Sequence, residues 1–321
     1  MNNLTQNYKI ILEKLTENCS HIESFSQVRQ PKLSNLELVA INITAEYMSY
    51  NSELQLFKTI KRTELEDKIE RSVYNKRRRR LIGYTEKNRQ SLSQKFAHLS
   101  NLFIVDSAPV QICKNSRAKR SNICATYEIQ PSFGYCAAQK THYFGYNLHL
   151  VCDENSIVHS FDLAPANIHD INYLKDIKYN LKSCELVGDR AYISADYQTD
   201  LFQQSQIKLF IPMRSNSLNP TAFSPVKRQK RKRIETLISQ LVGQFAMNVN
   251  LAKTLKGLIV RISAKITAIT INYSQLFYCY AVRPIRLLCG SGRRQKESLE
   301  GRNFPMKSRD FLSLPILSLL P

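Results

Sequence analysis

The order of short apolar runs after residue 101 constrains the fold more than any other feature of this chain. Three runs of strand length come first, and further runs then alternate with segments of helical periodicity. The strand-like runs lie at 102–105, 143–152, 157–163, 185–187 and 207–211, with one further short run at 110–113. The helical segments lie at 170–181, 194–204 and 227–242. This order predicts an α/β fold in which a mixed sheet carries helices on its faces.

Before residue 102, apolar residues recur at helical spacing, so we expect an all-α region over residues 1–100. Ser34 and Glu37 have the spacing of a capping box, and Ser52 with Gln55 opens another helix. Two short helices joined by a tight polar turn suggest a helix-turn-helix, a motif that binds DNA. A plain helical bundle gives the same periodicity, and the sequence leaves both interpretations open.

The 321-residue chain has a strong excess of positive charge, because 46 Lys+Arg against 26 Asp+Glu give +20. Such an excess indicates a polyanionic partner, and nucleic acid is the first candidate. An anionic membrane surface is the alternative, but no apolar run reaches the roughly 18 residues that a spanning helix needs. The eight cysteines are scattered without a C-x-x-C pair, so we expect reduced thiols in a cytoplasmic protein.

Two basic runs are candidate DNA contacts. The first consists of five consecutive cations at a predicted helix end: Lys76, Arg77, Arg78, Arg79 and Arg80. The second opens the helix at 227–242 and consists of Lys227, Arg228, Lys230, Arg231, Lys232 and Arg233. A cationic run on a helix is often only a solvated face, but in so basic a chain we interpret these runs as phosphate contacts.

Glu235 follows the second basic run and is the only acidic residue between Asp200 and Glu297. It lies at the edge of an apolar stripe that includes Ile234, so a docked helix would point it toward a cleft. The simpler interpretation is an intrahelical ion pair with Arg231, four residues earlier. The sequence alone does not decide between an ion-pair partner and a metal ligand.

Two further acids, Asp106 and Asp189, follow strand-like runs, and strand ends in α/β sheets are where sites are built. If the fold gathers them with Glu235, they would repel one another unless a cation neutralises them or one acid is protonated. Carboxylate oxygens suit Mg²⁺ or Mn²⁺, and two such ions can activate a water or a 3′-hydroxyl at a phosphodiester. This constellation therefore predicts metal-dependent chemistry on nucleic acid.

Other polar residues near the predicted strands have simpler interpretations. An Asp after a strand is often only a turn residue or a helix cap, and we interpret Asp162, Asp170 and Glu185 in this way. His149 lies on a predicted strand and is an outside candidate for a contact with the scissile phosphate.

Several sequence blocks, taken in order, match one known family. They are F-I-V-D-S-A-P-V at 103–110, G-Y-N-L-H-L-V at 145–151, H-S-F-D-L-A at 159–164, A-N-I-H-D at 166–170, G-D-R-A-Y at 188–192 and R-K-R-I-E-T-L-I-S-Q-L at 231–241. Over about residues 2–272 the chain resembles the DDE transposases of bacterial insertion sequences. The blocks around Asp189 and Glu235 are fairly specific together, whereas either alone is modest evidence.

The resemblance implies an RNase H-like catalytic domain at 101–272 behind the helical DNA-binding region. Asp106, Asp189 and Glu235 would form the acidic triad that binds two Mg²⁺ ions, with Mn²⁺ as a substitute. The activity implied is nicking at terminal inverted repeats, followed by transfer of the 3′ ends into target DNA. The implied partner is double-stranded DNA, contacted near the site also by Arg190 and bound by a nucleoid-associated homo-oligomer.

The chain departs from the family pattern in two places. Ala191 stands where relatives commonly have Gly, and residues 273–321 form a basic, Leu- and Pro-containing ending that we expect to be irregular. We hypothesise that this tail is frameshifted. The alternatives to an active transposase are a non-catalytic DNA-binding regulator, an RNase H-like nuclease without strand transfer, and an inactive transposase remnant.

Overall fold

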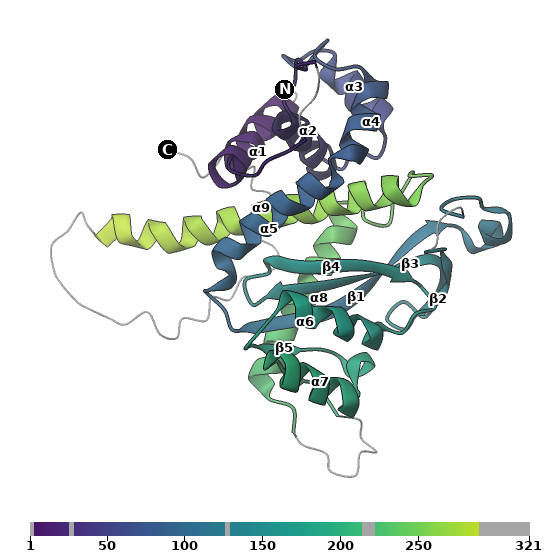
Figure 1. Ribbon diagram of the computed structural model, residues 1–321, viewed down its shortest axis with the longest axis vertical. Coiled ribbons are helices and arrows are strands. Elements are labelled where there is room, and N and C mark those ends of the chain that lie inside the picture. Colours follow the sequence, from purple (N-terminus) through teal and green to yellow (C-terminus); the bar gives the residue numbers. More distant parts are fainter. Residues whose placement is uncertain (1–2, 26–28, 126–128, 214–221, 289–321) are drawn as a thin grey trace. The chain divides into compact units, whose positions relative to one another are not determined.

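A long strand, β1 (Leu102–Cys113), is the centre of the sheet in the computed structural model (Figure 1). The structure describes residues 3–25, 29–125, 129–213 and 222–288, with side chains as far as residue 276. Residues Met1–Tyr273 form one compact unit and Ser274–Pro321 form a second. The description below concerns the first unit, apart from the final turns of the last helix.

The strands have the order of an RNase H-like sheet. On one side of β1 lie antiparallel strands, and on the other side lie short parallel strands. The other strands are β2 (Ser132–Cys136), β3 (Thr141–Asp153), β4 (Val158–Pro165), β5 (Glu185–Val187) and β6 (Lys208–Phe210). The order β4-β3-β1-β5-β6 confirms the predicted mixed sheet, and β2 adds a short ribbon beside β3.

The helices α6 (Leu174–Asn180) and α7 (Ala195–Ser205) cover one face of this sheet. Phe103 and Val105 of β1 join the core beneath them, together with Leu174 and Leu201. Because side chains alternate along a strand, Ile104 and Asp106 point to the opposite face. The helix α8 (Pro225–Gly243) packs against β1 with Ile234, Leu237 and Leu241 buried, and it lies behind the sheet in Figure 1.

The strand β1 is longer than the sequence predicted. The apolar runs at 102–105 and 110–113 form a single strand, so Asp106 lies inside β1 and not at its end. Pro109 is tolerated there because β5 pairs only with Leu102–Ile104, which leaves that edge of β1 without a parallel partner. Strand β2 was not predicted, because it is short and lies in a mostly polar stretch; its large side chains, Phe133 and Tyr135, are exposed.

The N-terminal region contains helices that pack as a bundle. They are α1 (Leu4–Cys19), α2 (Asn35–Tyr47), α3 (Glu53–Ile60), α4 (Arg71–Arg80) and α5 (Ile82–Ala97). Both predicted caps are present, because Ser34 and Glu37 form a reciprocal capping box and Ser52 accepts from the Gln55 amide. Every residue from Leu38 to Glu46 is buried, so α2 is the centre of a bundle.

The last described helix, α9 (Leu255–Leu288), extends beyond the predicted end of the family-like region. Residues 273–288 are therefore helical, where we expected an irregular tail; no glycine or proline interrupts residues 274–283. Residues 289–321, including the rest of the tail, lie outside the described residues. Within the described chain, no helix is both long and apolar enough to cross a bilayer.

Candidate active site

Two of the predicted acids meet because of the parallel pairing of β1 with β5. The register places Ile104 beside Val187, and Asp106 and Asp189 each follow two positions later. Neighbouring strands lie about 4.8 Å apart, so equal offsets along parallel strands bring these two carboxylates to the same level of the sheet. The Ser107 amide donates to Asp106 Oδ1 at 2.8 Å, and the Ala191 amide donates to Asp189 Oδ1 at 2.8 Å.

The electrostatics of the pair reflect this closeness. Burial raises the pKa of Asp106 to about 7; the Ser107 hydrogen bond opposes the increase, and the charge of Asp189 adds to it. Burial also raises the pKa of Asp189, against the Ala191 hydrogen bond. Elevated carboxyl pKa values in a shared, partly buried place are typical of sites that hold a cation or move a proton.

Asp170 is a third acid at this place, although the sequence suggested only a turn or cap. It opens a short 3-10 turn, Asp170–Tyr173, just before α6. The Ser107 hydroxyl donates to Asp170 Oδ2 at 2.9 Å, and Asn147 Nδ2 donates to Oδ1 at 3.3 Å. Its charge raises the pKa of both Asp106 and Asp189. The only sequence signal for it was its place in the block A-N-I-H-D at 166–170.

Glu235 reaches this site only through Arg231. Arg231 Nη2 lies 2.7 Å from Glu235 Oε1, which is the intrahelical ion pair that the sequence left open. The Arg231 charge also lowers the pKa of Asp106 and of Asp189. One guanidinium therefore interacts electrostatically with both aspartates and with Glu235. The Glu235 side chain is 47% exposed. The structure thus places Arg231 where the three acids need a positive charge.

Asp106 and Asp189 fit a hard divalent cation, because carboxylate oxygens are its preferred ligands. One oxygen of each aspartate accepts from a backbone amide, and the other oxygen is the one that would bind the cation. In the described residues, however, no three His, Cys, Asp or Glu side chains lie together as a metal-binding group. Asp106 and Asp189 therefore suit an ion as they stand, whereas the structure pairs Glu235 with Arg231 and does not bring it into a metal-binding group with them. The six cysteines whose side chains the structure describes are all free.

The predicted DNA contacts on α8 and near the site fall into two groups. Lys227 and Lys230 are held in ion pairs with Glu185 at 2.7 Å and Glu154 at 2.5 Å. The exposed cations are Arg190, Arg228 and Lys232, whereas Arg231 and Arg233 are partly buried. The exposed side chains can reach a phosphate without breaking a carboxylate contact.

The basic run on α4 is similarly divided. Arg77 is buried and donates to the Leu33 carbonyl at 3.0 Å and to Asn35 Oδ1 at 2.9 Å. The remaining members differ in their surroundings: Arg78 binds Glu53, Arg79 binds Asn75 of its own helix, and Lys76 and Arg80 are exposed. Arg77 is therefore committed to the bundle, because a buried guanidinium with two acceptors cannot also reach DNA.

His149 lies close to the acids but not at the surface. It is 1% exposed, its ring stacks on Tyr173 with centroids 4.9 Å apart, and its Nδ1 lies 3.9 Å from Asp170 Oδ1. Burial lowers the pKa of His149, against the charge of Asp170. A side chain so enclosed has no route to a scissile phosphate in this conformation, and it packs beneath Asp170 instead.

A sheet in the order β4-β3-β1-β5-β6, with aspartates side by side on β1 and just after β5, defines an RNase H-like protein with an acidic site. Residues 96–250 match the family described as the transposase DDE domain, and this match supports a DDE-type transposase. Proteins of this family normally use divalent metal ions.

The other comparisons add little to this family assignment. No curated protein matches the sequence. Among solved structures, the chain is similar to a Mos1 transposase paired-end complex with left transposon end, at 11% identity and a TM-score of 0.21. That likeness covers 82% of this chain and 84% of the other, and so low a TM-score does not establish a shared fold.

Proposed function

We propose that this protein cleaves DNA at the terminal inverted repeats of an insertion sequence and transfers the 3′ ends into target DNA. The observation that carries the proposal is the pair Asp106–Asp189, held side by side by the β1–β5 register and accompanied by Arg231 and Glu235. The family match over residues 96–250 supports the same class of reaction. We infer that the protein works as a homo-oligomer on DNA in the bacterial cytoplasm, at the nucleoid.

Asp106 and Asp189 would hold the divalent ions, and Glu235 would complete the set after rotating away from Arg231. Bound Mg²⁺ would supply the means to activate a water or 3′-hydroxyl and to stabilise the leaving oxygen. The amides of Ser107 and Ala191 fix one oxygen of each aspartate, which orients the other oxygen. Arg231, once released from Glu235, would bind a phosphate of the DNA, because it lies beside the acids and is only partly buried.

The test compares Asp189→Asn and Glu235→Gln with a control, Asp162→Asn, which alters an exposed acid on β4. The substrate is a supercoiled plasmid that carries the DNA flanking this gene, incubated with Mg²⁺. We expect the two site variants to lose strand cleavage while retaining DNA binding, because they remove ion ligands and not phosphate contacts. We expect the control variant to cleave like the parent protein.

The same assay separates the alternatives. If the parent protein binds DNA but gives no product with Mg²⁺ or Mn²⁺, it is a regulator or an inactive remnant. If it cleaves but cannot join a pre-cut donor end to a target plasmid, it is a nuclease without strand transfer. If Glu235→Gln cleaves normally while Asp189→Asn does not, the ion pair with Arg231 is the only role of Glu235.

A further inference from the structure

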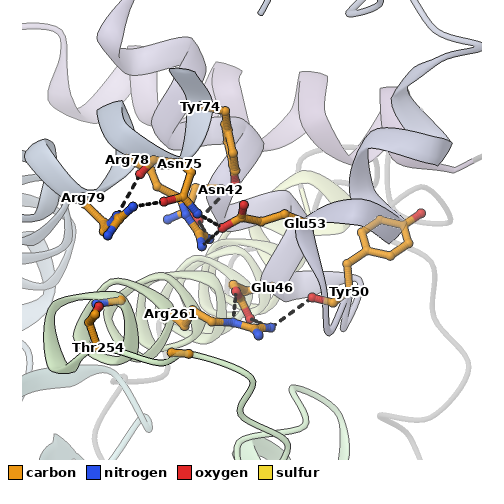
Figure 2. A network of polar contacts seen from close by, with 12 residues as sticks. Asn42, Glu46, Tyr50, Glu53, Tyr74, Asn75, Arg78, Arg79, Thr254 and Arg261 are labelled. Atoms are coloured by element: carbon orange, nitrogen blue, oxygen red, sulfur yellow. Dashed lines mark hydrogen bonds and ion pairs between the residues drawn. The ribbon is translucent and has the colours of Figure 1, made fainter. Parts of the chain in front are cut away.

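A cavity of about 400 Å³ lies in the helical part of the molecule, away from the acidic site. It is lined by residues at the end of α2, in α3 and α4, and in the segment that leads into α9. Figure 2 labels several of them, including Glu46, Glu53 and Arg79. Sites for small ligands or ligand groups typically measure about 300–1,000 Å³, so the cavity is large enough for a phosphate with its adjoining sugar.

Both carboxylates that line the cavity are neutralised by neighbouring protein groups. Glu46 is 2% exposed and binds Arg261 at 2.7 Å and Lys265 at 2.8 Å. Glu53 binds Arg78 and Asn75 (Figure 2). These acids therefore do not repel an anion that enters the cavity, because each is already paired with a cation.

The cations that line the cavity without binding Glu46 or Glu53 make one of its walls positively charged. Arg71 and Lys253 are exposed, line the cavity, and form no ion pair with any residue that the structure describes. Arg79 contributes a third positive charge and, within the part of the chain that the structure describes, donates to Asn75 of its own helix. Thr254 and Gly257 line the same wall at the start of α9, where the Gly257 amide already donates to the Thr254 hydroxyl at 3.2 Å and the helix dipole adds a partial positive charge.

Two further observations indicate that this cavity takes a ligand. The side chain of Arg78 is 10% exposed, and its Nε–H has no hydrogen-bond partner among the residues that the structure describes. Native proteins usually satisfy such buried polar atoms. At the rim, Leu54 and Leu251 are 51% and 58% exposed, which offers apolar contact to a sugar or base beside a phosphate.

We propose that this cavity binds a backbone phosphate of the DNA, with Arg71, Arg79 and Lys253 as its cationic contacts. DNA is favoured over a free anion because exposed Lys76 and Arg80 continue the basic surface along α4, outside the cavity. The choice of DNA as partner rests on the proposed function, but the site does not depend on catalysis.

The test measures binding of a fluorescent duplex of mixed sequence to the full chain in EDTA, where no metal-dependent cleavage interferes. The double variant Arg71→Gln/Lys253→Gln is compared with Lys61→Gln/Arg62→Gln, which removes the same charges from exposed positions of the bundle outside the cavity. We expect the cavity variant to reduce the log–log salt slope by about 0.9, since the cavity holds one phosphate in this proposal and each phosphate contact contributes about 0.9. The control should change the slope much less.

An equal loss in both variants overturns the proposal, since it would reflect net charge alone, and so does an unchanged slope in the cavity variant. A second arm titrates inorganic phosphate and a deoxynucleoside monophosphate by calorimetry. If the cavity variant no longer binds inorganic phosphate or the nucleoside monophosphate but still binds the duplex, the site belongs to a free anion. This outcome also overturns the proposal. Circular dichroism confirms that both variants fold. A protein that binds the duplex here but never cleaves it disproves only the proposed function.

Discussion

At the scale of single residues, Asp106 lowers the free energy of unfolding when it ionises, because its carboxyl is buried. Its pKa is raised to about 7 by burial, with the charges of Asp189 and Asp170 adding to the effect. In the unfolded chain an Asp ionises near pH 4. Between about pH 4 and pH 7, Asp106 is already ionised in the unfolded chain but still protonated in the folded protein. The free energy of unfolding therefore falls as the pH rises through that window.

Asp106→Asn should therefore stabilise the metal-free protein at pH 8, by about 2–4 kcal/mol at about 1.4 kcal/mol per pKa unit. The difference from the parent should disappear below about pH 3, where both states of the parent are largely protonated at this position. Urea unfolding across the pH range measures it, with Asp162→Asn as the exposed control. A variant less stable than the parent at pH 8 would contradict the assigned pKa shift.

Asp170 permits a second prediction at this scale, because it acts on Asp106 through charge without sharing its backbone contact. Asp170→Asn keeps a side chain that can still accept from Ser107, but it removes the negative charge that acts on Asp106 and Asp189. The pKa of Asp106 should fall, and the pH window in which stability declines should narrow at its upper end. Carbon-13 NMR titration of the Asp carboxyls gives the readout; an unmoved Asp106 titration would show that the two carboxylates do not interact.

At the scale of elements, α4 combines structural and exposed cations in one run. Arg77 is bound inside the bundle, whereas Lys76, one position earlier, is exposed. A helix necessarily produces this division, because successive residues point about 100° apart. The run is thus neither a purely solvated face nor a uniform DNA contact.

Arg77→Ala should lower the free energy of unfolding by about 1–3 kcal/mol, since it leaves the Leu33 carbonyl and Asn35 without their donor. Lys76→Ala should change stability by less than about 0.5 kcal/mol, as is usual for exposed positions. Duplex binding at low salt should weaken in the Lys76 variant. Chemical denaturation and fluorescence anisotropy measure the two effects, and equal stability losses would show that Arg77 is not buried as described.

At the scale of the whole unit Met1–Tyr273, buried charges connect the N-terminal bundle to α9. Glu46 of α2 binds both Arg261 and Lys265, and Arg261 also donates to the carbonyls of Tyr50 and Asn51. Burial lowers the pKa of Lys265, and the charge of Glu46 opposes that decrease. The first turns of α9 therefore belong to the bundle as much as α2 does.

Glu46→Gln should destabilise the protein by about 3–5 kcal/mol, the usual cost of removing one partner from a buried ion pair. Glu64→Gln is the matched control, because Glu64 pairs with Lys9 at 3.2 Å on the surface and such pairs contribute about 0–1 kcal/mol. Urea unfolding of both variants provides the comparison. A loss for Glu46→Gln no larger than that for the control would show that the network is solvated.

The sequence by itself determined the local structure and the order of the strands. The caps at Ser34 and Ser52, the mixed sheet and the helix around Glu235 follow from spacing and periodicity, which are local properties of the chain. Only the tertiary structure decided which distant side chains meet: it brought Asp170 to Asp106, and it buried Arg77 and His149. Burial and charge pairing depend on atoms from distant parts of the chain, and no local pattern records where the fold will place them.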